Sequence, residues 1–278
     1  MDINRLKKLA AEKAVEEISS GMIVGLGSGS TVQFALERIS EKLKNGELKN
    51  IQCIPSSTQT EKEAIRLGIP ITTLNEVVKR ETGNGNQKSE VRNQKSASRI
   101  QHPASRNQYP ESSIKYQVSS IQKPESLCID LTIDGADEVD EELNLIKGGG
   151  GALLREKILA QASKRLIIII DETKLSKHLG TKWSVPIEVI PFAANVEQKY
   201  LESLGAKVSR RKNPDGSDYI TDENNFILDA NFCEIKNAKE LSVLLNQRAG
   251  IVEHGLFINL TSMVFCAYQE GVKIIRCK

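Results

Sequence analysis

The stretch from Asp134 to Lys157, DGADEVDEELNLIKGGGGALLREK, constrains the fold of this chain more than any other feature. It follows residues 127–133, LCIDLTI, whose alternation of apolar and mixed positions predicts a strand. Asp134 is therefore expected at the carboxyl end of a strand, where open α/β sheets place their ligands. The stretch itself contains an acidic loop, a lysine, a glycine run and the beginning of a helix.

The glycine run, Gly148 to Gly151, follows Lys147 and leads directly into residues 152–160, which have the composition of a helix. Glycines at the start of a helix offer free backbone N–H groups and the positive end of the helix dipole, so this place suits an anion. An isolated Asp or Glu would indicate a solvated surface loop. A plain surface loop, however, does not require the glycine run that follows here.

DGADEVD followed by KGGGGALLREK resembles the signature of the type A ribose-5-phosphate isomerases, aldose-ketose isomerases of the pentose phosphate pathway. The resemblance extends to GLGSGST near the N-terminus, to DETK after an isoleucine run and to IVEHGLF near the C-terminus. It implies that Glu156 is the proton-transferring base and that Lys147 lies beside the developing oxyanion. It also implies that Asp134 and Asp137 surround the ring oxygen and hydroxyls of the sugar, and that Lys174 lies near its phosphate.

These motifs together define a set of residues that we expect to bind a small sugar phosphate. The set consists of Ser28, Gly29, Ser30, Thr31, Asp134, Gly135, Ala136, Asp137, Lys147, Gly148, Gly149, Gly150 and Lys174. The family usually has threonine at the position of Ser28, and serine keeps the hydroxyl group.

The N-terminal motif, GLGSGST at residues 25–31, lies between a predicted strand and a predicted helix. A dinucleotide fingerprint would need its third glycine one place later and an acid at the end of the next strand, which here ends in PSST. A P-loop would need a lysine in the loop, and none is present. Residues 25–31 are therefore expected to hold a phosphate or sugar hydroxyls, or else to form a tight turn without a ligand.

Strand and helix patterns alternate along most of the chain, which predicts an α/β fold with a doubly wound, mostly parallel sheet. Strands are expected at residues 22–24, 51–54, 69–74, 127–133 and 166–170, and helices at 6–18, 32–43 and 58–67. Residues 185–253 have a β-α-β-β-α pattern closed by Ile251-Val252, which predicts a second, smaller α+β domain of the ferredoxin-like type. The larger catalytic domain would then comprise residues 1–184 and 254–278. His254 is given a structural role.

Residues 79–125 interrupt this alternation. They are rich in Asn, Gln, Ser, Lys and Arg, and NQKS at 86–89 returns at 93–96 without the apolar positions of a coiled coil. So polar a segment cannot bury enough area to offset its ordering entropy, which predicts a disordered, low-complexity insertion. Its nine Lys or Arg against four Glu account for the net charge of +2. An inert insertion is the simpler interpretation, and a basic tether is the alternative.

Composition excludes several classes of function. Aromatic residues make up 4% of the chain, which argues against stacking on nucleic acid. No apolar run approaches the ~18 residues of a membrane span, and the N-terminus lacks an apolar signal, so a cytoplasmic protein is expected. The five scattered cysteines indicate free thiols. Since neither a nucleotide motif nor a metal-ligand spacing is found, we expect no cofactor and no metal.

Two alternatives remain beside the isomerase. One is a related sugar-phosphate isomerase or a CoA transferase on a similar sheet, against which the set of Asp134, Asp137, Lys147 and Glu156 argues. The other is a sugar-phosphate sensor without catalysis. The resemblance also implies a homodimer or homotetramer.

Overall fold

The computed structural model describes residues 2–83 and 128–276. Most of the predicted insertion therefore lies outside the described residues, as does Leu127 of the strand predicted at 127–133. The beginning of the insertion was placed wrongly, because helix α4 (Leu74–Gly83) continues through residues 79–83.

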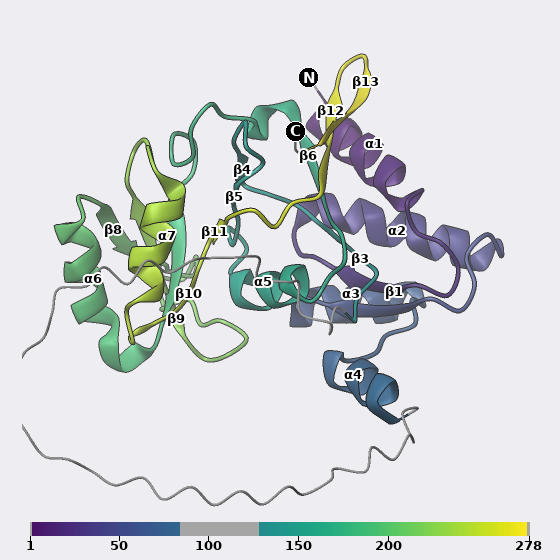
Figure 1. Cartoon of the computed structure of the whole chain (residues 1–278), viewed down its shortest axis with the longest axis horizontal. Helices are drawn as coiled ribbons and strands as arrows, with labels where there is room; N and C mark the ends of the chain where they lie inside the picture. Colours follow the sequence, from purple (N-terminus) through teal and green to yellow (C-terminus); the bar gives the residue numbers. More distant parts are fainter. Residues whose placement is uncertain (1, 84–127, 277–278) are drawn as a thin grey trace, which may run out of the picture.

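A six-stranded sheet forms the larger part of the molecule (Figure 1). Its order is β13-β12-β6-β3-β1-β2, and all neighbouring strands are parallel except the pair β12 and β13. The strands are β1 (Ile23–Leu26), β2 (Gln52–Pro55), β3 (Leu131–Asp134), β6 (Leu166–Asp171), β12 (Met263–Tyr268) and β13 (Gly271–Arg276). This confirms the predicted mostly parallel, doubly wound sheet, in which Asp134 is the last residue of β3.

Both faces of this sheet are covered. Ile167 and Ile169 of β6 pack with α1 and α2 on one face, and Ile168 and Ile170 pack on the other face with residues from β12 and β5. Each fully buried isoleucine contributes about 1.5–3 kcal/mol, which explains why a continuous apolar run occupies this central strand. The helices of this part are α1 (Ile3–Val15), α2 (Ser30–Lys44), α3 (Thr58–Leu67), α4 and α5 (Leu153–Gln161).

The strand predicted at residues 69–74 was wrong. Only Ile71 forms an isolated bridge, to Cys53, and α4 begins at Leu74. The residues Thr73 and Glu76 favour a helix here. The Thr73 hydroxyl accepts a hydrogen bond from the Glu76 N–H, and the Glu76 carboxylate accepts one from the Thr73 N–H. This capping box starts a helix. Strand β12, which the sequence analysis did not predict, lies between β6 and β13.

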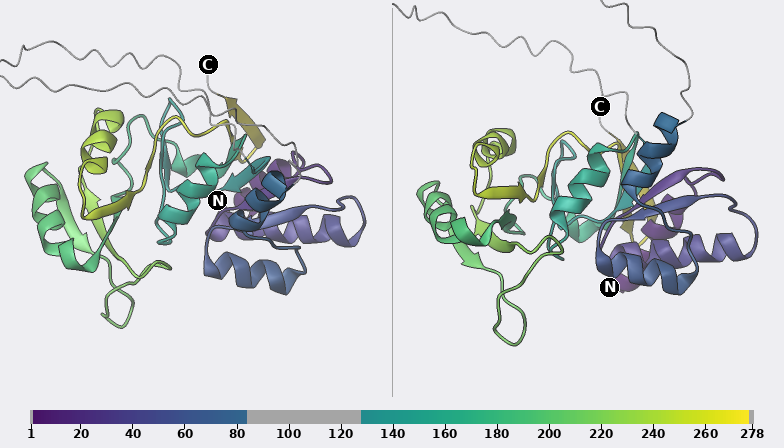
Figure 2. Two further views of the ribbon diagram at one scale, coloured as in Figure 1. Left: turned by 60° about the horizontal axis from the view of Figure 1, so that its bottom comes forward. Right: turned by 90° about the horizontal axis from the view of Figure 1, so that it is seen from below.

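A separate antiparallel sheet has the order β10-β7-β9-β8 (Figure 2). Its strands and helices are β7 (Val185–Val189), α6 (Ala194–Ser203), β8 (Lys207–Arg210), β9 (Phe226–Asn231), α7 (Ala238–Asn246) and β10 (Ile251–His254). Apolar residues of the sheet and of both helices form a core of their own. The βαββαβ order with this strand arrangement confirms the predicted ferredoxin-like fold.

A small three-stranded sheet, β11-β5-β4, lies between the two larger sheets. It consists of β4 (Glu138–Val139), β5 (Leu145–Ile146) and β11 (Leu256–Phe257), and the short helices η1 (Glu172–Lys174) and η2 (Pro191–Ala193) complete the described elements. Gly255 joins β10 to β11, where its N–H donates to Pro186 O and its carbonyl accepts from the Lys147 N–H at 2.9 Å. The connection between the sheets therefore fixes the backbone of Lys147.

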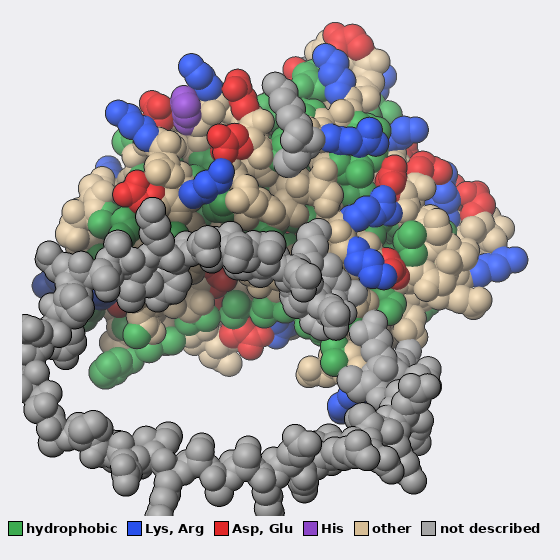
Figure 3. All heavy atoms as spheres, viewed as in Figure 1, with side chains coloured by type: hydrophobic (Ala, Val, Ile, Leu, Met, Phe, Trp, Pro, Cys, Tyr) green, Lys and Arg blue, Asp and Glu red, His purple; other side chains and the backbone are tan. Residues whose placement is uncertain are grey.

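Charged side chains of both signs intermix over much of the face drawn in Figure 3. Within residues 2–83 and 128–276, every helix is too short or too polar to cross a bilayer.

Candidate active site

A cleft opens at the carboxyl ends of β1 and β3. The chain leaves β1 toward β2 and leaves β3 toward β6, in opposite directions along the sheet, which is where doubly wound sheets bind ligands. The cleft contains about 520 Å³ of empty space, part of it open to solvent. It is lined by Lys7, Ser28, Gly29, Ser30, Thr31, Gly135, Ala136, Asp137, Lys147, Gly148, Gly149, Gly150, Glu156 and Lys174. Asp134 lies buried behind this lining.

The first glycine loop, residues 25–31, connects β1 to α2. Gly27 is required because a Cβ atom there would lie 2.0 Å from the Asp134 carboxylate. Gly29 has a φ of +100°, which favours glycine, and it precedes α2 without a side-chain cap. The first N–H groups of α2 are thus left for an anion at the positive end of the helix.

The hydroxyl of Ser28 hydrogen-bonds within a cluster of hydroxyls from the end of β2 and the start of α3. Its Oγ lies 2.8 Å from Ser56 Oγ and 2.9 Å from Ser57 Oγ, and the Ser28 N–H donates to Asp134 Oδ1. Ser28 therefore links the first glycine loop to β2 and to Asp134. Ser56 and Ser57 belong to the run PSST at residues 55–58, which has no acid for binding a dinucleotide and instead holds the Ser28 hydroxyl.

Two partly buried lysines border the first glycine loop. Lys7, on α1, donates to Ser30 Oγ at 2.9 Å. Lys174, on η1, also lines the cleft, and its ammonium lies 5.2 Å from the centre of the Trp183 ring. Lys7 was missed in the sequence, where the first helix was given a packing role, because no local pattern connects it to a loop some twenty residues away.

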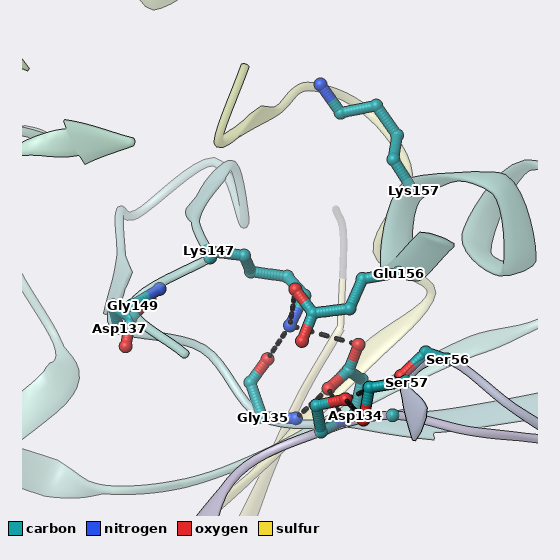
Figure 4. Close-up of polar contacts among 12 residues, drawn as sticks. Ser56, Ser57, Asp134, Gly135, Asp137, Lys147, Gly149, Glu156 and Lys157 are labelled. Atoms are coloured by element: carbon teal, nitrogen blue, oxygen red, sulfur yellow. Dashed lines mark hydrogen bonds and ion pairs between the residues drawn. The ribbon is translucent and has the colours of Figure 1, made fainter. Parts of the chain in front are cut away.

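Three charged side chains meet at the floor of the cleft (Figure 4). The Lys147 ammonium lies 3.0 Å from Asp134 Oδ2 and 3.3 Å from Glu156 Oε2, and it donates to Gly135 O at 2.7 Å. All three side chains are at least 95% buried. Lys157, the residue after Glu156, points away from them (Figure 4). We call Asp134, Lys147 and Glu156 the buried triad.

Burial changes the acid-base properties of the triad. Loss of water, together with the neighbouring Asp134 carboxylate, raises the pKa of Glu156 to about 8. Burial also raises the pKa of Asp134, although Lys147 opposes it. For Lys147, burial acts to lower the pKa, but the carboxylates of Asp134 and Glu156 outweigh it and raise the pKa above its ordinary value. Two carboxyl groups that share one ammonium are expected to hold one proton between them near neutral pH.

Each of these carboxyl groups directs one buried oxygen at the Lys147 ammonium. Asp134 Oδ2 and Glu156 Oε2 lie 3.0 and 3.3 Å from Lys147 Nζ, and no other group in the described chain donates to them. One ammonium therefore serves two buried carboxyl groups, which can accept a further hydrogen bond from a ligand.

The second glycine loop, Gly148 to Gly151, forms another wall of the cleft. The Gly149 N–H donates to Asp137 Oδ2 at 2.7 Å, which orients this carboxylate. A Cβ atom on Gly149 would lie 2.7 Å from the same carboxylate, so glycine is needed there. The loop leads into α5, whose first turn has no side-chain cap and carries Glu156.

The other carboxylates of the acidic stretch have different positions. Glu138 is buried and accepts hydrogen bonds from the N–H groups of Gly180, Lys182 and Trp183. Asp140 accepts from the Asn144 N–H and side chain, which closes the turn between β4 and β5. These two residues hold loops in place, whereas Asp137 lines the cleft and Asp134 contacts Lys147 behind that lining.

The geometry combines a buried carboxyl group able to exchange a proton near neutral pH, an adjacent ammonium, and a cationic region at a helix N-terminus. Together these groups suit proton transfer on a small anionic substrate whose oxygen atom gains negative charge during the reaction. In the described part of the chain, no three His, Cys, Asp or Glu side chains are grouped so that they could hold a metal ion.

Comparisons with known proteins agree with this chemistry. A family model described as ribose 5-phosphate isomerase A (phosphoriboisomerase A) matches residues 104–271. A ribose-5-phosphate isomerase A from Desulfatibacillum aliphaticivorans is 46% identical over 268 residues, covering 96% of this chain and 95% of the relative. One from Chloroflexus aurantiacus is 40% identical over 267 residues, covering 96% of this chain and 91% of the relative.

Solved structures give the same result. A D-ribose-5-phosphate isomerase in complex with phospho-erythronic acid has a TM-score of 0.79 at 33% identity, covering 99% of this chain and 100% of the other. A ribose 5-phosphate isomerase from Plasmodium falciparum has a TM-score of 0.78 at 37% identity, with the same coverage.

Proposed function

Because the chain belongs to the ribose 5-phosphate isomerase A family and is an enzyme of that kind, we propose that it isomerises its substrate through an enediolate with Glu156 as the base. The two sugars are D-ribose 5-phosphate and D-ribulose 5-phosphate, and the reaction would belong to the non-oxidative pentose phosphate pathway. That the chain forms a homodimer or homotetramer stays a prediction.

The proposed reaction moves one proton between neighbouring carbons. The Glu156 carboxylate removes the proton from C2 of the open-chain aldose, and the electrons of that bond form the C1–C2 double bond of the enediolate. The former carbonyl oxygen then bears negative charge. Glu156 returns the proton to C1 while the proton of the O2 hydroxyl is transferred to the negatively charged O1, so that C2 becomes the carbonyl of the ketose and C1 carries a hydroxyl group.

The observation that carries this proposal is the contact between the Glu156 carboxyl group and the Lys147 ammonium, 3.3 Å apart in a buried site. A base whose pKa lies near neutrality can both take and return a proton, and general base catalysis contributes about 10²–10⁴-fold. An ammonium facing the developing oxyanion contributes about 10²–10³-fold. Glu156 lines the cleft, where its Oε2, which has no donor other than Lys147 in the described chain, can contact a substrate group.

The first glycine loop with Lys7 and Lys174 is the proposed phosphate site. It combines the uncapped N-terminus of α2 with two ammonium groups at the cleft. Phospho-erythronic acid, the ligand of the solved relative, carries a phosphate and a carboxylate. We expect the phosphate of such a molecule at the first glycine loop and its carboxylate near Lys147, with Asp137 beside the sugar hydroxyls.

The test is the variant Glu156→Gln, which keeps the size of the side chain but removes the base. We expect kcat to fall at least ~10²-fold with little change in substrate affinity. Wild-type enzyme should exchange the C2 hydrogen of ribose 5-phosphate with solvent deuterium, and the variant should not. Assays after dialysis against EDTA, without added cofactor, test the expectation that none is needed.

Glu142→Gln, at an exposed position of the acidic loop, is the control and should behave as wild type. Near wild-type turnover or exchange in Glu156→Gln would show that the base lies elsewhere. Wild-type protein that binds ribose 5-phosphate without isomerising it would instead be a sensor.

A further inference from the structure

The loop between β8 and β9 leaves the small sheet and reaches the catalytic part of the molecule (Figure 2). We call residues 211–225 the crossing loop. Building on the function proposed above, we propose that Arg211 and Tyr219 of the crossing loop are positioning residues for isomerisation, which hold the second glycine loop so that its Gly149 and Gly150 N–H groups face the cleft. Neither side chain lines the cleft itself.

Three successive carbonyl oxygens of the second glycine loop accept hydrogen bonds from these two side chains. One terminal nitrogen of Arg211 donates to Gly148 O at 2.9 Å and to Gly149 O at 3.0 Å, and the Tyr219 hydroxyl donates to Gly150 O at 3.1 Å. The approach is close, because a Cβ atom on Gly151 would lie 2.2 Å from the Tyr219 hydroxyl. This contact explains the last glycine of the run.

The direction of a carbonyl group fixes the direction of the N–H group in the same peptide unit, because the planar trans peptide points them in opposite directions. Holding Gly148 O therefore directs the Gly149 N–H, which donates to the cleft residue Asp137. Holding Gly149 O likewise directs the Gly150 N–H toward the cleft side of the loop. No acceptor for the Gly150 N–H is found in the described part of the chain, so this group is available to a substrate oxygen.

Arg211 is itself held rigidly. Its Nε and second terminal nitrogen form a two-pronged ion pair with Asp229 on β9, which leaves the remaining nitrogen for the two carbonyl oxygens. The fixed planar fork of arginine allows this division, and a lysine ammonium would not. The guanidinium also lies 5.8 Å from the centre of the Tyr219 ring.

The far end of the crossing loop is attached at three further places. Thr221 and Asn225 donate to the buried Glu188 carboxylate on β7. The Asp222 carboxylate accepts from the N–H and hydroxyl of Thr58 at the start of α3, while Arg155 on α5 pairs with Glu223 at 2.6 Å. The crossing loop therefore joins the small sheet to α3, to α5 and to the second glycine loop at once.

The test compares Arg211→Gln and Arg211→Lys with the matched control Arg210→Gln. Arg210 precedes Arg211 and contacts Asp218, Asn195 and the Phe226 ring. In the described part of the chain it makes no hydrogen bond or ion pair with the second glycine loop. For Arg211→Gln we expect kcat on ribose 5-phosphate to fall about 10- to 100-fold with KM nearly unchanged, because an oriented N–H donor acts mainly on the developing charge. Arg211→Lys should recover only part of this loss, and Arg210→Gln should stay within about twofold of wild type.

A second measurement separates positioning from a general loss of structure. Affinity for phospho-erythronic acid, whose carboxylate resembles the charged intermediate, should fall with kcat in Arg211→Gln, while inhibition by inorganic phosphate should stay unchanged. An Arg211→Gln enzyme with normal kcat, or one in which only KM rises, would overturn the inference. If Arg211→Gln does not fold, Tyr219→Phe replaces it, with an expected loss of kcat of about 3-fold; an unchanged kcat there would overturn the inference too.

These outcomes are distinct from a failure of the proposed function. If wild-type enzyme and Glu156→Gln behave as proposed but Arg211→Gln and Tyr219→Phe are normal, only the positioning role is wrong. If wild-type enzyme does not exchange the C2 hydrogen, the proposed mechanism is wrong whatever the crossing loop does.

Discussion

The two ends of the cleft differ in how much water reaches their charged groups. At the first glycine loop, Lys7 and Lys174 are only partly buried, and the loop is fixed by its own sheet through Ser28 and Asp134. At the second glycine loop, Lys147 and Glu156 are 2% and 4% exposed. That loop is held from outside, by the crossing loop of the small sheet.

This difference indicates that the first glycine loop acts mainly in substrate binding and the buried triad mainly in the chemical step. Partly exposed lysines keep their hydration and are screened by salt, so they attract an anion equally well before and during the reaction. Buried groups act in a medium of low dielectric constant, where a charge that appears during the reaction has a much larger effect. We therefore expect changes at the first glycine loop to act on KM and changes at the buried triad to act on kcat.

The largest expected effect is that of Lys147→Ala. In the proposed mechanism, removing the ammonium would leave the enediolate oxygen without its cation, so kcat should fall about 10²–10³-fold while KM changes little. Steady-state kinetics on ribose 5-phosphate measure both values. Loss of a buried ion-pair partner also costs about 3–5 kcal/mol of stability, so the assay must be made well below the melting temperature of the variant. A rise in KM with kcat unchanged would show that Lys147 binds the phosphate. It would contradict the assignment of kcat effects to the buried triad.

The second effect concerns the pH dependence of stability. The folded-state pKa of Glu156 is raised to about 8 from an ordinary value of 4.5. The unfolded chain releases this proton first, so the contribution of Glu156 to stability is lost as pH rises from about 4.5 to about 8. Glu156→Gln removes this loss. Its free energy of unfolding relative to wild type should therefore grow with pH, by up to about 1.4 kcal/mol per pH unit.

Urea unfolding of wild type and variant, followed across this pH range, measures that difference. Glu270→Gln, an exposed position in the turn between β12 and β13, is the control and should give no such trend. A flat difference for Glu156→Gln would mean that the carboxyl group is ionised in the folded enzyme throughout the range.

The smallest effect is expected for Lys174→Ala. One charge-assisted hydrogen bond is worth about 1.5 kcal/mol or more, so KM should rise about 10-fold while kcat stays within about 3-fold of wild type. The difference in KM between Lys174→Ala and wild type should become smaller as salt is added, because salt screens the charge of Lys174. Lys177→Ala, at an exposed position nearby that does not line the cleft, controls for the loss of one charge. A loss of kcat larger than the rise in KM would place Lys174 in the chemical step.

The sequence by itself determined the parts that local periodicity and motifs encode. The isoleucine run of β6, the βαββαβ order of the small sheet and the position of Asp134 at the end of β3 follow from patterns spanning a few residues. The motif at residues 134–157 also identified Lys147 and Glu156 as candidate catalytic residues, although the sequence did not specify the distance between their side chains. At residues 69–76 the sequence contains two conflicting local signals. The apolar alternation of residues 69–74 predicts a strand, but the capping box of Thr73 and Glu76 starts a helix, and the helix forms.

Tertiary structure alone decided which polar groups meet. The Ser28 hydroxyl contacts Ser56 at the end of β2. Glu138 holds a neighbouring loop, whereas Asp137, one residue before it in the sequence, lines the cleft. Tertiary structure also brought Lys7 from the first helix and Arg211 from the small sheet to the two glycine loops. The physical reason is that periodicity records which face of an element is buried, whereas a contact between distant elements depends on how those faces pack against each other.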